Sequence, residues 1–234
     1  MNRHLVNIHI PKTAGTALRK NLNRVFSKPP PNPSFIFGPK AGKYEDMRKD
    51  FTSLLPKLFD RKERMLSGHY RYRDIVDVIT HVRDDITLIT FLREPIRRTI
   101  SDYFYSISDV HTDPTGFKAQ YPTFEHYMQS TEQMTKTLNY LRPNDDASST
   151  ETLQSIIEHF DFVGITENFE SDLQHILGEL GEKATDVRTA NENKNQDAAL
   201  NAYEKYATQL NDILSDDCFI YNGILKHRNI SLKP

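Results

Sequence analysis

The segment 4–19 constrains what this chain can fold into more than any other stretch. An apolar run rich in β-branched residues, 5–10, ends at Pro11, and a short run of small and polar residues follows it. From Ala14 onward, apolar residues recur every three or four positions, which places them on one face of an α-helix. The segment therefore predicts a buried strand, a tight loop and an amphipathic helix.

The loop at this junction has the chemistry of an anion site. The first amides of a helix have no partner within the helix, and the helix dipole adds positive partial charge there. Gly15 allows the backbone to approach a ligand closely, and Lys12 adds a mobile positive charge. Thr13 and Thr16 offer hydroxyl groups. We interpret the loop as a cradle for a phosphate or sulfate group; the alternative is a plain strand-to-helix turn with a solvated lysine.

The loop is not a Walker A loop, in which the lysine follows the second glycine. Here Lys12 precedes the only glycine. A nearer imitation at 38–44 has three residues between its glycines where four are needed. It also ends in Tyr44, where a serine or threonine would reach magnesium. We interpret 38–44 as an ordinary loop.

The composition limits the classes of protein to which the chain can belong. With 234 residues, the chain fits one α/β domain, 1–234, with a single sizeable core. Its net charge of −2 gives no reason to expect nucleic acid or an anionic membrane as a partner. No apolar run approaches the ~20 residues of a membrane span, the first predicted strand leaves no room for a signal peptide, and Cys218 is the only cysteine. We expect a cytoplasmic protein without a membrane span, a disulfide or a metal site.

Strands and helices alternate along the rest of the chain. Segment 86–92 is the clearest strand, because an almost unbroken apolar and β-branched run is typical of a parallel sheet covered on both faces. Further strands are predicted at 64–67 and 160–165, and helices at 46–59, 72–82, 95–107, 123–141, 149–159, 166–180 and 200–214. Loops are expected at 27–43, 109–122 and 182–197. The alternation predicts an open parallel sheet flanked by helices, with ligands beyond the carboxyl ends of the strands.

Three strand ends bring polar residues to one edge of this sheet. Lys12 follows the first strand, His69 the second and Arg93 the third. Because the carboxyl ends of parallel strands share an edge, we expect these side chains to lie close together. Ser101 lies about two helical turns after Arg93, and the pair can hold a second phosphate through a guanidinium fork and a hydroxyl. The alternative for Arg93 is a structural ion pair with Glu94 or another carboxylate.

These residues resemble the motifs of sulfotransferases that use 3′-phosphoadenosine 5′-phosphosulfate (PAPS). Segment 9–16, His-Ile-Pro-Lys-Thr-Ala-Gly-Thr, is similar to their 5′-phosphosulfate loop, and segment 91–105 is similar to their 3′-phosphate motif. The chain looks most like the carbohydrate branch, with its heparan-sulfate 2-O-type and small bacterial enzymes, and Ser-Gly-His-Tyr at 67–70 agrees with it. The resemblance implies a single P-loop-like α/β domain with a central parallel sheet flanked by helices.

The resemblance also implies a role for each residue. Lys12 would contact the oxygen that bridges sulfate and phosphate, and Arg93 and Ser101 would hold the 3′-phosphate. His69 would be the general base that takes the proton of the acceptor hydroxyl. Five consecutive residues would donate amides or hydroxyls to the 5′ side: Thr13, Ala14, Gly15, Thr16 and Ala17. The products would be a sulfated acceptor, most simply a saccharide, and 3′-phosphoadenosine 5′-phosphate (PAP), with no metal required.

Other interpretations of the chain stay open. A P-loop kinase that uses ATP is opposed by the missing lysine after the loop glycine and by the lack of a strand-ending aspartate for magnesium. A non-catalytic nucleotide-binding module would keep the cleft without turnover. The loops 27–43 and 109–122 would form the acceptor surface, and their residue types fit many ligands. The sequence predicts no particular oligomeric state.

Several nearby side chains have ordinary structural interpretations. We expect His9 to be a packed histidine and the aromatic residues 103–105 to be helix core. The asparagine-rich stretch 191–195 is interpreted as a solvated loop. Arg71 and Arg73 are equally well explained as surface residues; if either faced the cleft, an acidic or already sulfated acceptor would be favoured.

Overall fold

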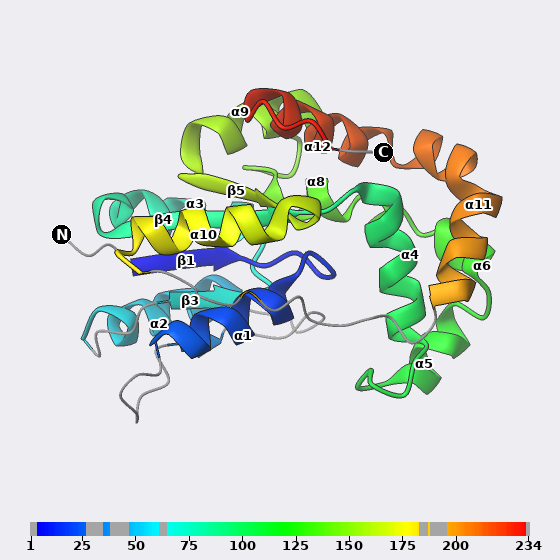
Figure 1. The fold of residues 1–234 in the computed structure, drawn as a ribbon, viewed down its shortest axis with the longest axis horizontal. Coiled ribbons are helices and arrows are strands. Elements are labelled where there is room, and N and C mark those ends of the chain that lie inside the picture. The colour runs from blue at the N-terminus through cyan, green and yellow to red at the C-terminus, as the bar shows by residue number, and fades with distance from the viewer. Residues whose placement is uncertain are drawn as a thin grey trace.

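The structure is a computed structural model that describes residues 4–26, 35–37, 47–60, 65–182, 187 and 196–232. Within these residues, five parallel strands form one sheet in the order β2-β3-β1-β4-β5 (Figure 1). The strands are β1 (His4–Ile8), β2 (Phe35–Phe37), β3 (Met65–Gly68), β4 (Ile86–Leu92) and β5 (Phe162–Ile165). This arrangement confirms the predicted α/β fold.

The register of the sheet brings three strand ends together. Ile8, the last residue of β1, lies opposite Gly68, the last residue of β3. On its other side Ile8 lies opposite Thr90, and β4 continues to Leu92. The chain therefore leaves these three strands on one edge of the sheet, as the sequence predicts.

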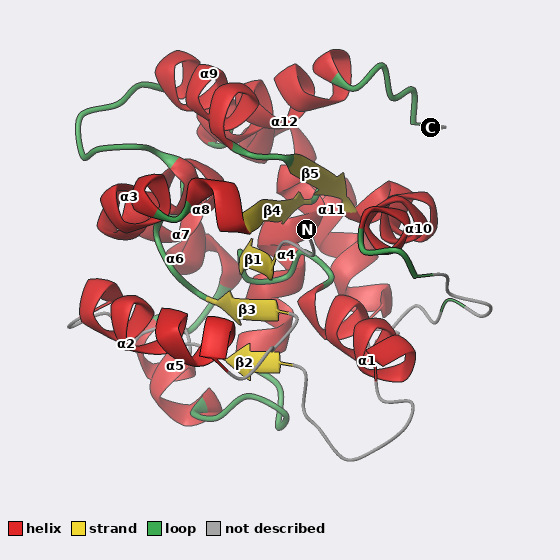
Figure 2. Ribbon diagram, turned by 90° about the vertical axis from the view of Figure 1, so that its left-hand side faces the viewer, coloured by secondary structure: helices red, strands yellow, loops and turns green. Residues whose placement is uncertain are grey.

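Helices cover both faces of the sheet, which explains the apolar runs in its strands. Alternate strand residues, such as Leu5 and Ile89, face one side of the sheet and pack with α1 (Gly15–Phe26) and α10 (Phe169–Glu179). The strand residues between them, such as Val6 and Leu88, face the other side and pack with α2 (Met47–Asp60), α3 (Tyr72–His81) and α9 (Ser149–His159). Figure 2 shows α1 and α10 on one side of the strands and α2, α3 and α9 on the other.

A third apolar cluster lies beyond the carboxyl ends of the strands. It is formed by α4 (Pro95–Ser106), α5 (Pro114–Gln120), α6 (Phe124–Met128), α7 (Thr131–Met134) and α11 (Gln196–Ile213). The remaining helices, α8 (Lys136–Leu141) and α12 (Ser215–His227), pack on α9. In Figure 1, α4, α5, α6 and α11 stand at the end of the sheet toward which the strand arrows point.

The structure corrects three predictions about loops and helices. The predicted loop 27–43 contains β2, a short strand at the edge of the sheet. The predicted loop 109–122 contains α5, because the Asp113 side chain accepts from the amide of Gly116 at 2.8 Å and Pro114 suits a first helical turn. The predicted helix 123–141 is three short helices, α6, α7 and α8.

Other boundaries agree with the sequence. β4 has the predicted bounds, and α10 is followed by Gly181 at a φ of 72°, the conformation that stops a helix. The segments 38–44 and 191–195 lie outside the described residues. Among the helices that the structure describes, none is both long and apolar enough to cross a membrane.

Candidate active site

The loop between β1 and α1 has the backbone geometry of an anion cradle. Lys12 and Ala14 both have positive φ, 71° and 61°, so the loop turns sharply before α1 begins. The first amide of α1 that bonds back within the helix is that of Leu18, to the oxygen of Ala14 at 2.9 Å. The amides before it in the helix have no such partner and remain available to a ligand. The Thr13 hydroxyl, in contrast, donates to Ile10 O at 2.8 Å, which leaves the amide as the donor of that residue.

A histidine packs directly on this loop. A Cβ atom at Gly15 would lie 2.2 Å from the imidazole of His9, so only glycine fits beneath the ring. The ring centroid of His9 is 4.7 Å from that of His69. Burial lowers the pKa of His9 well below its usual value, and the charges of His69 and Lys12 act in the same direction. His9 is thus a packed histidine, as the sequence predicts, and it joins the loop to His69.

One hydrogen bond defines the tautomer of His69. This residue follows β3, and its Nδ1 is 2.8 Å from the carbonyl oxygen of His9. A carbonyl can only accept, so Nδ1 carries the hydrogen and Nε2 carries the lone pair. Burial lowers the pKa of His69, although the hydrogen bond that it donates to the His9 carbonyl acts in the opposite direction. A neutral imidazole with a free lone pair has the properties of a general base.

Arg93 lies beside the loop, at the end of β4. Its Nη1 is 3.4 Å from the carbonyl oxygen of Lys12, and burial lowers its pKa while Glu167 raises it. Glu94 serves another purpose, since its carboxylate accepts from the amides of Ile96 and Arg97 at 3.2 and 2.6 Å and caps α4. Burial raises the pKa of Glu94, and its two amide bonds oppose that rise. The structure thus brings Lys12 and Arg93 together, with Glu94 as a helix cap.

The Lys12 ammonium lies over an aromatic ring. Its Nζ is 3.7 Å from the ring centroid of Tyr105, in the geometry of a cation–π contact. Burial lowers the pKa of Lys12 to about 8, with Asp102 acting against the shift and Arg93 acting with it. Tyr103 is core, as predicted, but Tyr105 is 38% exposed. Tyr105 is therefore a site residue that the sequence analysis assigned to the core.

Ser101, Arg71 and Arg73 are the other residues that the sequence singled out. Ser101 is half-buried on α4, in the helix that begins just after Arg93. Arg71 is paired with Asp74 at 2.6 Å. Arg73 is paired with Asp145 at 2.9 Å, and it also donates to a carbonyl of α8. Both arginines are thus engaged in ion pairs close to His69 in the sequence.

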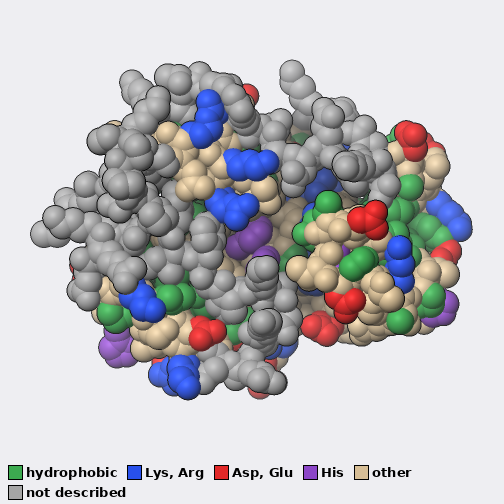
Figure 3. Space-filling view, turned by 90° about the horizontal axis from the view of Figure 1, so that it is seen from below, with side chains coloured by type: hydrophobic (Ala, Val, Ile, Leu, Met, Phe, Trp, Pro, Cys, Tyr) green, Lys and Arg blue, Asp and Glu red, His purple; other side chains and the backbone are tan. Residues whose placement is uncertain are grey.

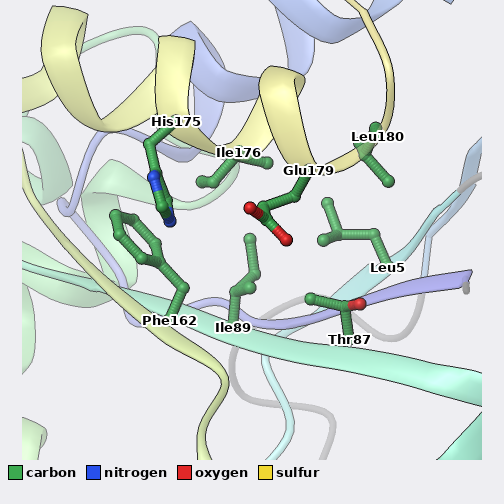
Figure 4. Close-up of a pocket in the computed structure, with 8 residues that line it drawn as sticks. All are labelled: Leu5, Thr87, Ile89, Phe162, His175, Ile176, Glu179 and Leu180. Atoms are coloured by element: carbon green, nitrogen blue, oxygen red, sulfur yellow. The ribbon is translucent and has the colours of Figure 1, made fainter.

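One face of the molecule has a hollow. In this hollow, seen from below, histidine atoms are visible next to Lys and Arg side chains (Figure 3). A separate small recess lies between α10 and the sheet, lined by Leu5, Thr87, Ile89, Phe162, His175, Ile176, Glu179 and Leu180 (Figure 4). Leu5, Thr87 and Phe162 lie toward the amino ends of β1, β4 and β5, and His175 and Glu179 of α10 are exposed, so this recess opens at the surface away from the carboxyl edge.

Comparisons with known proteins give two similar solved structures and one family match. The chain is similar to a sulfotransferase from Alicyclobacillus acidocaldarius, with 14% identity and a TM-score of 0.48 over 93% of this chain and 96% of that one. It is also similar to mouse sulfotransferase SULT7A1 complexed with PAP, with 13% identity and a TM-score of 0.45 over 86% of this chain and 65% of that one. No curated protein sequence matches the chain. A family model described as "Sulfotransferase family" matches residues 2–218 of the 234, and the chain therefore belongs to the sulfotransferase family.

Proposed function

We propose that this sulfotransferase transfers the sulfuryl group of PAPS to a hydroxyl group of an acceptor. The observation that carries the proposal is the pairing of a lysine-bearing anion loop with a neutral histidine at one edge of the sheet. His69 presents Nε2 as a lone pair, and the loop supplies amides that have no partner within α1. Sulfotransferases use PAPS, and the residues of this site fit that nucleotide.

The positively charged and amide groups match the two ends of the nucleotide. Lys12 and the amides of 13–17 would bind the 5′ phosphosulfate. Arg93 and Ser101 would bind the 3′-phosphate, the guanidinium through two parallel donors. Burial makes each of these charge contacts stronger than it would be in water.

The reaction needs one proton transfer and one in-line displacement. The acceptor oxygen bonds to sulfur while its proton moves to Nε2 of His69. The bond between sulfur and the bridging oxygen breaks, and its electron pair stays on the phosphate, where Lys12 stabilises the new negative charge. The sulfated acceptor and PAP leave, and His69 returns its proton to water.

For the acceptor, we propose a saccharide hydroxyl. The support is the resemblance of the segments 9–16 and 67–70 to the carbohydrate branch of the family. We also propose that the protein acts in the cytoplasm, since a single cysteine suits a reducing compartment. Incubation with PAPS and a panel of saccharides, followed by mass spectrometry, tests the acceptor class directly.

Calorimetric titration with PAP tests the nucleotide. We expect micromolar binding that is lost in Arg93→Ala and is absent for ATP with magnesium. No binding of PAP, or a preference for ATP with magnesium, would overturn the assignment and favour a kinase. Binding of PAP without turnover on any acceptor would instead indicate a non-catalytic module.

Two substitutions test the chemical step. We expect Lys12→Ala to lower turnover by about 10²–10³-fold and His69→Ala by about 10²–10⁴-fold, because each removes a group that acts in the transition state. Lys205→Ala is the matched control, since Lys205 is an exposed lysine of α11. Near-normal turnover in both site variants would contradict the proposed mechanism.

A further inference from the structure

A buried carboxylate beside the site holds a lysine that the proposed reaction does not yet use. Asp102 of α4 is 5% exposed. Its Oδ2 accepts from the Tyr127 hydroxyl at 2.9 Å, contacts the Lys136 ammonium and lies 3.5 Å from Nη1 of Arg98. Two cations therefore share one carboxylate, so Asp102 does not fully neutralise Lys136. Burial disfavours the charged carboxylate, yet Lys136 and Arg98 outweigh it and lower the pKa of Asp102 to about 2.

The backbone that carries Lys136 is anchored from a distant part of the chain. Lys136 is the first residue of α8. Asp217 of α12 accepts from the amides of Thr137 and Leu138 at 2.9 and 3.0 Å. Because these bonds satisfy the first amides of the helix, they hold the start of α8 in place. The backbone from which the Lys136 side chain extends is thus fixed.

Two helical relationships connect Lys136 to Lys12 and to His69. Asp102 and Tyr105 are three residues apart on α4 and share a face, and Lys12 lies over the ring of Tyr105. Lys136 and Tyr140 are four residues apart on α8 and share a face, and the Tyr140 ring centroid is 6.4 Å from that of His69. The helix that carries Lys136 is thus in contact with His69, and the carboxylate that Lys136 contacts shares a helix face with the ring beneath Lys12.

The electrostatics of the site agree with this placement. Burial is the main cause that lowers the pKa of both Lys12 and His69. Beyond burial, the charge of Lys136 lowers both values and that of Asp102 raises both. The charge of Lys136 thus acts on both of the residues that would flank the sulfuryl group.

We propose that Lys136 is a second catalytic lysine, whose ammonium donates to the sulfuryl oxygens during transfer, and that Asp102 is its positioning residue. The inference rests on the proposed function. An ammonium has three donors, and Asp102 is the one acceptor in contact with Lys136 among the described residues. The Lys136 side chain is 16% exposed, so it is not sealed within the core. Lys136 neither gains nor loses a proton: the acceptor proton still goes to His69, and the electron pair of the broken bond still stays on the phosphate of PAP.

The affinities for PAPS and for PAP distinguish a catalytic role of Lys136 from a structural one. PAP lacks the sulfuryl group, so Lys136→Met should weaken PAPS binding by about 10-fold or more and leave PAP binding unchanged. Turnover should fall by about 10²–10³-fold. Loss of a merely structural lysine would weaken both nucleotides alike or neither. Lys205→Met is the control for the loss of a lysine charge elsewhere.

A second variant keeps the inference testable if Lys136→Met does not fold. Lys136→Arg retains the charge beside Asp102, but its fork engages the carboxylate with two donors and no longer offers a compact ammonium. We expect normal thermal stability and PAP binding with turnover reduced by about 10-fold or more. Wild-type turnover in either folded variant would overturn the role of Lys136. If the unmodified enzyme neither binds PAP nor transfers sulfuryl groups, the proposed function fails instead.

Discussion

His69, the proposed base, depends on one hydrogen bond and on its burial. The carbonyl of His9 accepts a hydrogen bond from Nδ1–H, and burial lowers the pKa of the imidazole and so favours its neutral form. In the proposed reaction Lys12 has the opposite requirement, because it must be positively charged to stabilise the leaving phosphate. Its pKa is lowered to about 8 by burial, close enough to neutrality for its charge to be sensitive to pH.

These two residues predict a bell-shaped dependence of kcat/KM on pH. At low pH His69 is protonated and cannot accept a proton, so kcat/KM should rise with pH through a value below the usual ~6.5 of histidine. Above pH about 8 the free enzyme loses the Lys12 charge, so kcat/KM should fall. Initial rates from pH 5 to about 10 test both limbs.

The alkaline limb has its own control. Arginine stays charged throughout this range, so Lys12→Arg should abolish the fall above pH 8, whatever its absolute rate. An unchanged alkaline limb in Lys12→Arg would assign that limb to another group.

Among the elements, α4 carries several residues of the proposed site. Glu94 caps its first turn, and Ser101, Asp102 and Tyr105 follow along its length. Its opposite side joins the third apolar cluster through Ile96 and Ile100. Packing on one side therefore holds the helix in place. The polar groups on its other side are carried by this rigid helix and not by a loop, which fixes their positions.

An ion pair between Arg228 and Asp172 holds the end of α12 to the sheet. Arg228 donates from Nη1 and Nη2 to the two carboxylate oxygens of Asp172, each at 2.8 Å, and from Nη1 to Val163 O at 2.7 Å. Asp172, on α10, is almost fully buried and also accepts from the amide of Ile165 in β5 at 2.6 Å. One ion pair thus links α12, α10 and β5.

We predict that Arg228→Met lowers the free energy of unfolding by about 3 kcal/mol, because it leaves a buried carboxylate without its cation. The Arg228 side chain is itself partly exposed, so the lower end of the range for buried pairs applies. Urea denaturation followed by circular dichroism measures the change. Arg48→Met is the control: Arg48 pairs with Asp77 on the surface, and its loss should cost about 0.5 kcal/mol or less. Equal effects of the two substitutions would contradict the role given to Asp172.

At the scale of the whole molecule, both ends of the described chain share one core. The cluster on the α2, α3 and α9 face of the sheet contains Val6 from β1 and Ile224 from α12. The third apolar cluster joins α4 to α11, which are distant in sequence. Neither end of the chain can unfold without exposing apolar surface of the other.

We propose that residues 1–234 form one domain, and we predict one cooperative unfolding transition. Urea curves from circular dichroism and from tyrosine fluorescence, which dominates since the chain has no tryptophan, should coincide. Saturating PAP should shift the whole curve to higher urea without splitting it. Two separated transitions would show that the sheet and the helices beyond its carboxyl edge unfold independently.

Much of this architecture was predictable, because it depends on short-range patterns. The run 86–92 has the composition of a doubly covered strand, and it is β4 with the same bounds. Parallel topology then places Lys12, His69 and Arg93 on one edge without further information. β2 was missed because its three residues follow a proline-rich stretch, and α5 because its capping aspartate stands within a polar, loop-like segment.

The sequence by itself determined the strand–loop–helix at 4–19, the parallel α/β sheet and the residues that follow its strands, since each depends on local periodicity or on chain direction. Only the tertiary structure decided the tautomer of His69, the exposure of Tyr105 and the contact of Lys136 with Asp102. His69 and the carbonyl that binds it are 60 residues apart, and Lys136 and Asp102 are 34 apart. Such contacts arise when separate helices and strands pack together, and no pattern within one segment encodes them.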